Sequence, residues 1–278
     1  MDHIHSVKAC SIRHCSEVLG LRRQTYYHRK QGFRSEHKDD ELKMALKQAT
    51  RQFVAWGFWM VFHYLRNQGH AWNHKRVYRV WTELELNLRR APKREKIRRE
   101  YQQLLSPARI NEGWAMDFVS DWVVGPAQDS IRIINIMDES SRKALWTEAH
   151  KSISSNKLID VLDKVVAWRG QPAYIRCDNG PEFISEKLRE WAASKGIEIK
   201  YTQPGKPSQN GLIERLNKTL RVECVDQNWF TSLDELNEAL QNWSVTYNTL
   251  RPHENLKYKT PDQVEILNQN LYFYPVAA

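Results

Sequence analysis

The sequence predicts an α/β protein in which a mixed β-sheet, with helices on its faces, follows an all-helical region. After about residue 110, strand-like stretches come first as hairpins and then alternate with helices. Before it, apolar residues recur at helical spacing. The charge changes at the same place, since residues 1–110 hold 23 Lys and Arg against 10 Asp and Glu, whereas residues 111–278 hold 19 against 23. This asymmetry predicts a polyanion-binding front half, with a solvated basic face as the alternative.

The composition is that of a folded protein without a membrane span. Of the 278 residues, 41% are hydrophobic, which is enough for a packed core. The four cysteines have no CxxC spacing and no charged-then-apolar leader opens the chain, so we expect neither secretion nor a disulfide framework. No stretch approaches about 18 uninterrupted apolar residues, which excludes a transmembrane helix. These observations favour a reducing cytosol.

The first helical segment, residues 1–34, has the layout of a helix-turn-helix. Residues 16–30 predict a short helix that ends near Gly20 and a second, basic helix from about Arg22. Side chains that open such a second helix reach base edges or phosphates, so Arg22 and Arg23 are candidate DNA contacts. A plain helical hairpin fits this short segment equally well.

A second helical region, residues 35–92, is predicted from apolar residues at helical spacing between Asp39 and Asn87, with an interruption at Gly69. Its aromatic side chains are interpreted as core. After Gly69, basic residues alternate with apolar ones in an amphipathic helix. The candidate DNA contacts in this helix are Lys75, Arg76 and Arg79. Residues 93–110 predict a basic linker that acts as a hinge or contacts phosphates.

The remaining residues predict five strands and four helices in one mixed sheet with helices on its faces. The strands are expected over residues 114–124, 131–137, 143–149, 173–178 and 197–201. The helices are expected over residues 154–169, 181–194, 207–224 and 232–248.

Two carboxylates of this region sit where a site is expected. Asp117 lies inside the first strand among apolar neighbours, and a carboxylate in so apolar a strand needs a reason. Asp178 ends the fourth strand, where Asn179 and Gly180 turn the chain. Side chains at a strand end reach the carboxyl edge of a sheet, the usual place of ligand sites in α/β proteins.

A third carboxylate, Glu214, lies on the predicted helix over residues 207–224. Leucines of this helix form an apolar stripe, while Glu214, Lys218 and Arg221 share a separate polar face. An acid that holds a metal and cations that hold phosphate oxygens are the groups needed at a nucleic-acid cleavage site. Taken singly, each of the three acids is more often a solvated or capping residue.

Thirty-five residues, 179 to 213, separate Asp178 from Glu214, and this spacing comes with several motifs. These motifs are W-x-M-D-F at 114–118, D-x-S-S-R at 138–142, C-D-N-G-P-E-F at 177–183, P-G-K-P-x-Q-N-G-x-I-E-R-x-N at 204–217, Y-N at 247–248, R-P-H at 251–253 and T-P at 260–261. On these residues the chain resembles the DDE transposases and retroviral integrases, most closely the orfB-type catalytic protein of insertion sequence family three.

The resemblance implies a ribonuclease-H-like catalytic core over residues 111–262 and a C-terminal tail over residues 263–278. It implies that Asp117, Asp178 and Glu214 are a catalytic triad that binds two Mg²⁺ ions, with Mn²⁺ as an alternative. The implied reaction hydrolyses a phosphodiester at an element end and joins the freed 3′-OH to target DNA. Mg²⁺ prefers a few carboxylates together with phosphate and water, which agrees with such a triad.

The resemblance also implies partners and a location. The partners are double-stranded DNA, as element ends and as target, further copies of this chain, and a protein of an upstream reading frame, with no membrane. The location is the bacterial cytosol, in association with the nucleoid. Candidate phosphate contacts near the triad are Lys206, Asn210, Lys218 and Arg221.

Two rival functions remain compatible with these residues. One is a catalytically silent DNA-binding repressor derived from a transposase. The other is a nuclease that cleaves DNA without joining it.

Other titratable residues compete with the triad. Asp121 shares a strand face with Asp117 but lies roughly 13 Å along the strand, so we exclude it. A hairpin turning near residue 126 would bring Asp138 close to Asp117, but the D-x-S-S-R element of the resembling family is outside its triad, so we interpret Asp138 as structural.

Histidines and cysteines do not add a predicted metal site. Zinc is not expected at His3, His5, Cys10 and Cys15, because their spacing does not match the usual ligand pairs. His150 and His253 are interpreted as hydrogen-bonded structural histidines.

Overall fold

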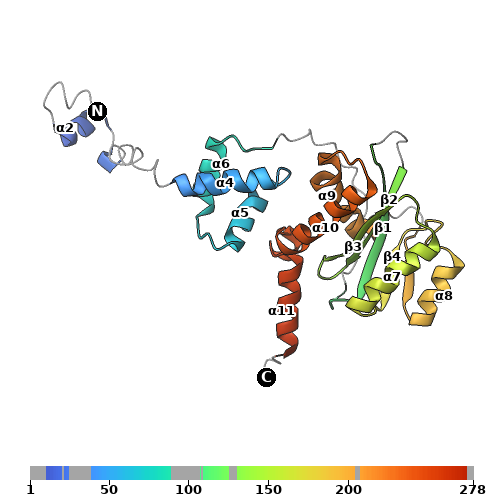
Figure 1. The fold of residues 1–278 in the computed structure, drawn as a ribbon. Coiled ribbons are helices and arrows are strands. Elements are labelled where there is room, and N and C mark those ends of the chain that lie inside the picture. The colour runs from blue at the N-terminus through green and yellow to red at the C-terminus, as the bar shows by residue number, and fades with distance from the viewer. Residues whose placement is uncertain are drawn as a thin grey trace. The chain divides into compact units, whose positions relative to one another are not determined.

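The computed structural model describes residues 11–20, 22–24, 39–88, 107, 109–124, 130–203 and 207–273, although not the side chains of 207, 208 and 269–273. The chain divides into two compact units, residues 1–88 and 89–278 (Figure 1). The division falls just before the stretch predicted as a basic linker, most of which lies outside the described residues. Within the described ranges, every helix is too short or too polar to span a bilayer.

The first unit begins with the short helix α2 (Ile12–Val18). Ser11 caps it, since its hydroxyl oxygen accepts a backbone hydrogen bond of 3.2 Å from the first turn. After α2, Gly20 adopts φ +61°, the left-handed conformation that glycine favours, at the predicted turn. Arg22 and Arg23 are exposed, but the predicted second helix from residue 25 on lies outside the described residues. The helix-turn-helix within residues 1–34 therefore stays a prediction.

Three helices, where two were expected, follow in the first unit. They are α4 (Asp40–Gln52), α5 (Phe58–Asn67) and α6 (His74–Glu83). Apolar spacing continues from α4 into α5, but the chain breaks there because Phe53 leaves helical backbone (φ −126°, ψ 70°) and its ring stacks on Trp56 at 3.8 Å. Gly57, in extended backbone, then precedes α5. Buried apolar side chains from all three helices form the core, although Trp59, interpreted as core, is 51% exposed.

Asp39, just before α4, holds α6 in place through two ion pairs. Its buried carboxylate accepts a hydrogen bond from Arg76 Nε at 2.8 Å and another from the Arg79 guanidinium. Burial raises the pKa of Asp39, but the two arginines outweigh this effect and hold the pKa below its usual value. Two of the three predicted DNA contacts on α6 thus have a partner within the protein, whereas Lys75 is exposed.

We expect Asp39→Ala to lower the free energy of unfolding of the first unit by about 1.5–3 kcal/mol, because it removes charge-assisted hydrogen bonds that join two helices. Glu41→Ala changes an exposed acid of the same region and should stay within about 0.5 kcal/mol. Urea unfolding of the full chain, with hydrogen exchange read in residues 39–88, measures both. Equal exchange protection of α6 in the two variants would contradict the role given to Asp39.

The second unit is built on a five-stranded mixed sheet. Its strands are β1 (Gly113–Trp122), β2 (Ser130–Asp138), β3 (Ala144–His150), β4 (Tyr174–Cys177) and β5 (Glu198–Tyr201). In space their order is β3-β2-β1-β4-β5. β1 pairs antiparallel with β2, and β2 with β3, whereas β1 with β4 and β4 with β5 are parallel. The prediction of a ribonuclease-H-like mixed sheet is confirmed.

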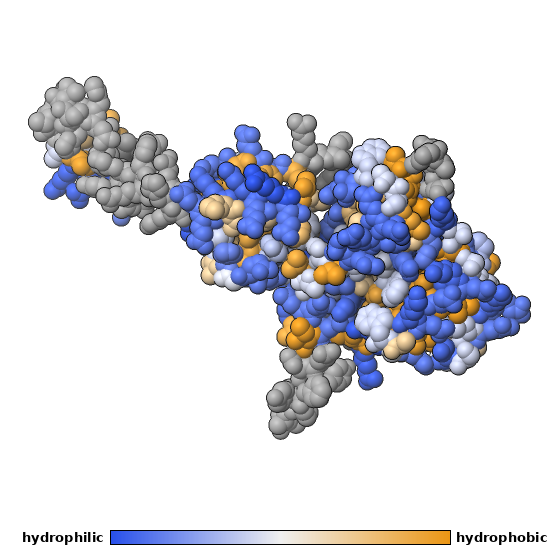
Figure 2. All heavy atoms as spheres, viewed as in Figure 1, coloured by the Kyte–Doolittle hydropathy of each residue, from blue (hydrophilic) through white to orange (hydrophobic). Residues whose placement is uncertain are grey.

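Two pairs of helices cover the two faces of the sheet (Figure 1). They are α7 (Ser155–Arg169) and α8 (Glu186–Lys195) on one face, and α9 (Gly211–Glu223) and α10 (Leu233–Thr249) on the other. Successive side chains of β1 point to opposite faces of the sheet. Trp114 and Met116 pack with α7 and α8, whereas Ala115 and Val119 pack with α9 and α10. This alternation places Asp117 on the α9 side. On the face shown in Figure 2, hydrophilic residues cover most of the surface of this unit.

Helix boundaries differ from the expectation in two places. α8 begins at Glu186 rather than at Pro181, because the amides of Phe183 and Ile184 bond back to the Gly180 carbonyl in a turn, and Ser185 then caps the helix. The expected helix from residue 207 begins as a short 3₁₀ turn, η2 (Pro207–Asn210), before α9. Two further 3₁₀ turns are η3 (Val225–Gln227) and η4 (Glu254–Leu256).

The segment predicted as a C-terminal tail contains a helix, α11 (Pro261–Phe273), which the sequence analysis did not anticipate. Glu265 of α11 is buried and accepts hydrogen bonds from Arg169 Nη1 at 3.1 Å, Lys143 Nζ at 2.9 Å and Ser141 Oγ at 3.2 Å. These contacts anchor the start of α11 to α7 and to the turn before β3.

Candidate active site

The first carboxylate of the candidate site, Asp117, lies midway along β1, opposite Asn135 of β2. It is half-buried on the α9 side of the sheet. Because β1 is the central strand, apolar cores on both faces hold its backbone in place. The position of Asp117 is therefore set by the most constrained strand of the fold.

The second carboxylate, Asp178, directly follows β4, the strand that pairs in parallel with β1. Its Oδ1 accepts a hydrogen bond of 2.9 Å from the Gly180 amide, which turns the chain away from the sheet. A Cβ added at Gly180 would lie 3.1 Å from Asp178 Oδ1 and 3.3 Å from the Phe183 ring, so the turn leaves little room for a side chain. This turn fixes Asp178 at the carboxyl edge of the sheet.

The third carboxylate, Glu214, lies in the first turn of α9 and is exposed. Ile213, Leu216 and Leu220 are buried against the sheet and set the rotation of the helix. Asn217 lies one turn beyond Glu214 and contacts Asp117, so Glu214 lies on the part of α9 next to the carboxylate of β1.

Two of the acids, Asp178 and Glu214, act electrostatically on the third. Burial, together with the negative charges of Asp178 and Glu214, raises the pKa of Asp117 to about 6, against the opposing hydrogen bonds from the Phe118 amide and Asn217. In the part of the chain that the structure describes, no Lys, Arg or His forms an ion pair with any of the three. Negative charge therefore accumulates here without a compensating cation from the described residues.

This arrangement bears on a metal ion in two ways. Three carboxylates are the oxygen donors that Mg²⁺ and Mn²⁺ prefer, and a divalent cation would offset their repulsion. Among the described residues, however, no group of three or more His, Cys, Asp and Glu side chains is close enough to hold a metal ion as it stands. The chemistry of the three donors fits a divalent cation.

A chain of two asparagines supports Asp117, and the sequence analysis did not single it out. Asn217 Nδ2 donates to Asp117 Oδ2 at 2.8 Å, and the buried Asn135 Nδ2 donates to Asn217 Oδ1 at 2.8 Å. Both asparagines are buried, so the network orients the carboxylate with little freedom. The available signal was the position of Asn217, three residues after Glu214, at the end of the I-E-R-x-N motif.

The predicted phosphate contacts near the triad differ in their surroundings. Lys218 is exposed on α9. Arg221 donates to Asp121 Oδ2 at 3.0 Å and to the Ser120 carbonyl at 2.5 Å, which gives Asp121 a structural partner and agrees with its exclusion from the triad. Asn210 is only 5% exposed, so its side chain is a poor phosphate contact. Lys206 lies outside the described residues.

The register of the sheet separates Asp138 from the triad. Asp138 pairs with Trp114 rather than with Asp117, and it is fully buried. Its carboxylate accepts backbone hydrogen bonds of 2.6 to 2.9 Å from Asn111, Ser140 and Ser141. The interpretation of Asp138 as structural agrees with this geometry.

The two histidines left without a role have ordinary structural contacts. Burial, together with the charge of Arg251, lowers the pKa of His253 to about 3, so its ring is neutral at physiological pH and lies 3.4 Å from the Tyr247 carbonyl. His150 ends β3 with Nε2 3.4 Å from Glu148, but this buried nitrogen has no hydrogen-bond partner among the described residues, so the expected hydrogen bond is not found there.

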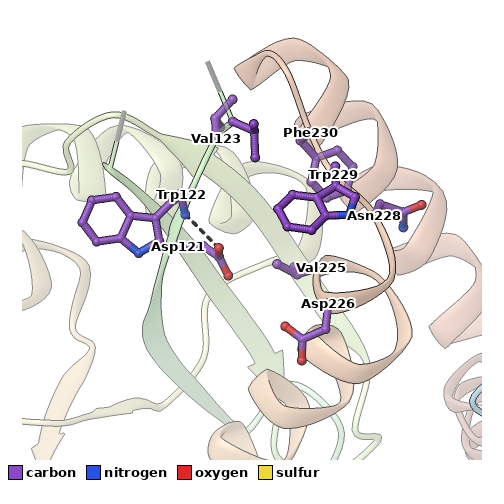
Figure 3. A pocket seen from close by; sticks show the side chains of 9 residues that line it. Asp121, Trp122, Val123, Val225, Asp226, Asn228, Trp229 and Phe230 are labelled. Carbon is purple, nitrogen blue, oxygen red and sulfur yellow. Dashed lines mark hydrogen bonds between the residues drawn. The ribbon is translucent and has the colours of Figure 1, made fainter. Parts of the chain in front are cut away.

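A pocket of about 530 Å³ lies at the far end of β1, away from the triad (Figure 3). It lies between the end of this strand and the turn that follows α9. Two acids, Asp121 and Asp226, line it together with the exposed Trp229. Carboxylates make it a poor place for a nucleic-acid phosphate, so it is not part of the candidate site.

Family comparisons cover both units. Two models described as the integrase core domain match residues 107–207 and 195–261, and one described as an HTH-like domain matches residues 37–94. The HTH-like match falls on the second predicted helical region rather than on residues 1–34.

Related proteins match most of the chain. The 31.7 kDa protein of insertion element IS407 from Burkholderia multivorans is 31% identical over 95% of this chain and 93% of its own length. The 39.2 kDa protein of insertion element IS476 from Xanthomonas euvesicatoria is 32% identical over 91% of this chain and 72% of its own. Transposase InsD of insertion element IS2 from Escherichia coli is 26% identical over 83% and 80%.

Proposed function

The chain belongs to the DDE transposases and retroviral integrases, in the branch of the insertion sequence family three catalytic proteins, and on the premise that it is a transposase we propose that Asp117, Asp178 and Glu214 are its catalytic triad. One observation carries the proposal. Three elements distant in sequence bring Asp178 and Glu214 within electrostatic reach of Asp117, and no described cation forms an ion pair with any of them.

In this proposal the triad holds two Mg²⁺ ions, for which Mn²⁺ can substitute. When bound, such a pair activates the attacking oxygen and stabilises the leaving oxygen of a phosphodiester. The transposase would thereby cleave DNA at the element end and join the freed 3′-OH to target DNA.

The chain's own side chains would position the reactants. Asn217 orients Asp117, and the Gly180 amide orients Asp178, so two of the three ligands are held before DNA arrives. Glu214 is exposed and meets the DNA from α9. Lys218, one turn further along α9, would hold a phosphate oxygen beside the site.

Double-stranded DNA is the proposed partner of the first unit as well. The HTH-like region would bind element ends, with the exposed Lys75 as its phosphate contact on α6 and Arg22 and Arg23 as further candidates. Arg76 and Arg79 contribute only where DNA displaces their contacts with Asp39. Two element ends must be held together for joining, so the active species would contain further copies of the chain, with a protein of the upstream frame as an additional partner.

A cleavage and joining assay on labelled DNA that carries the flanking element ends tests the triad. We expect Glu214→Gln to lose both reactions in Mg²⁺ while it binds the DNA as the wild type does, because the change keeps shape and removes charge. Glu238→Gln, which alters an exposed acid on α10, is the matched control and should keep wild-type rates.

The same assay separates the two rival functions. Cleavage without joining in the wild type would identify a nuclease. Binding without cleavage by both wild type and Glu214→Gln, even with an upstream-frame partner added, would identify a DNA-binding repressor and overturn the proposal.

A further inference from the structure

A group of contacts on the opposite face of the sheet ties the strand of Asp117 to the loop of Asp178. Phe118 follows Asp117 on β1 and therefore points to the α7 and α8 side. Its ring stacks on that of Phe183, with centroids 4.5 Å apart and planes 5° apart. Phe183 itself is fully buried and lies in the turn that follows Asp178. A single aromatic stack thus joins the two segments that carry the first two carboxylates.

A cation on β2, Arg132, lies over this aromatic stack. The Arg132 guanidinium carbon lies 4.3 Å from the centre of the Phe118 ring. The same guanidinium donates to the carboxylate of Glu182, the residue before Phe183, in an ion pair whose side chains are 30% and 15% exposed. Partial burial raises the pKa of Glu182, but Arg132 outweighs this effect and holds the pKa below its usual value. Arg132 therefore contacts both segments at once.

The loop that receives these contacts is itself held at several points. The Tyr201 hydroxyl donates to the Phe183 carbonyl at 2.9 Å, and the Ser185 hydroxyl to the Glu182 carbonyl at 3.0 Å. A shift of Phe183 or Glu182 would consequently move the whole turn that carries Asp178. Metal ligands must be placed to within about 0.5 Å, so contacts of this kind determine affinity.

We propose that Arg132, through its contacts with Phe118 and Glu182, is a positioning residue that sets the separation of Asp117 and Asp178 and thereby the affinity of the site for a divalent cation. The inference rests on the proposed function, since it takes these two carboxylates as metal ligands. Arg132 lies on the opposite face of the sheet from Asp117, so it would act through Phe118 and Glu182 rather than on the metal or the DNA directly.

Titration of Mn²⁺ into the full chain, without DNA and monitored by electron paramagnetic resonance, tests the role of Arg132 directly. We expect Arg132→Gln to raise the dissociation constant for Mn²⁺ by about 10- to 100-fold, the usual effect of losing a residue that supports metal ligands. The exchanged pair, Arg132→Glu with Glu182→Arg, should recover part of the loss, because it restores the ion pair in the opposite direction but not the cation over the Phe118 ring.

A second ion pair in the same helical layer provides the matched control. Lys195 Nζ lies 3.3 Å from Asp163 and joins α8 to α7, but it contacts neither carboxylate segment. Lys195→Gln should bind Mn²⁺ as the wild type does. Thermal unfolding of each variant separates positioning from loss of fold, and Arg132→Met, which also removes the charge, replaces Arg132→Gln if the latter unfolds below the assay temperature.

The outcomes separate a failure of the positioning role of Arg132 from a failure of the proposed metal site. Wild-type Mn²⁺ affinity in a folded Arg132→Gln variant, or in Arg132→Met where that is used, would overturn the positioning role and leave the triad intact. A wild-type chain that binds no Mn²⁺, or an Asp117→Asn variant that binds it normally, would overturn the proposed metal site and this inference with it.

Discussion

Asp117→Asn is expected to lower both end cleavage and joining by about 10²- to 10³-fold, and at the same time to stabilise the metal-free protein. The first effect follows because the change removes a charged ligand from the proposed metal site, and the loss of one preorganised electrostatic group commonly costs 10²- to 10³-fold. The second follows because the ionised carboxylate is unfavourable where it lies.

The raised pKa gives the size of this penalty. A rise from the usual value of 3.8 to about 6 means that the ionised group costs the folded chain about 3 kcal/mol at neutral pH. Asparagine has no such charge and can still accept the hydrogen bond from Asn217. We therefore expect the thermal unfolding midpoint at pH 7.5, measured in a chelator, to rise by several degrees.

The pH dependence follows from the same shift. The folded chain holds the proton of Asp117 more tightly than the unfolded chain does, so wild-type stability should fall as the pH rises from about 4 to 6. This fall in stability with rising pH should be absent in Asp117→Asn. Calorimetry across that range measures it.

Glu214→Gln is the matched comparison for this prediction. It removes a charge from the same triad, but from an exposed side chain, so activity should be lost without a comparable gain in stability. Equal stabilisation by the two variants would show that repulsion within the triad, rather than burial of Asp117, dominates. An active Asp117→Asn variant would remove this residue from the triad.

Glu265→Ala is expected to destabilise the second unit by about 3–5 kcal/mol, the second large effect. The side chain is only 9% exposed and receives hydrogen bonds from both Arg169 and Lys143. Its removal leaves two largely buried cations, with Asp262 and Asp138 as their nearest remaining acids, and uncompensated buried charge is costly.

Urea unfolding of the full chain, followed by tryptophan fluorescence, measures this loss. Glu254→Ala alters an exposed acid shortly before α11 and should change stability by less than about 0.5 kcal/mol. A change of that same small size in Glu265→Ala would mean that α11 is not anchored through this carboxylate.

The core fold and the family were predictable because local patterns and motifs determine them. Alternation in β1 put Asp117 on the opposite face from Met116, and the spacing between Asp178 and Glu214 pointed to the family before any geometry was known. These features depend on residues close in sequence or on motifs that keep a fixed distance.

The missed features depend on partners far apart in the chain. Arg221 has the spacing of a phosphate contact, but its partner Asp121 is 100 residues earlier. The break between α4 and α5 was hidden because apolar spacing continues through it, and the chain departs from helix only where Phe53 stacks on Trp56. Asn217 was part of a motif whose purpose is visible only once β1 lies beside α9.

The alternation of β1 limits how this region of the gene can change. A substitution at any position of the strand alters one side chain, but the gain or loss of a single codon would exchange its two faces. Asp117 would then point into the apolar layer between the sheet and helices α7 and α8, and Phe118 would point to the α9 side instead. Divergence among relatives in this strand is therefore expected to proceed by residue replacement at constant length, and insertions should accumulate in the connections outside it.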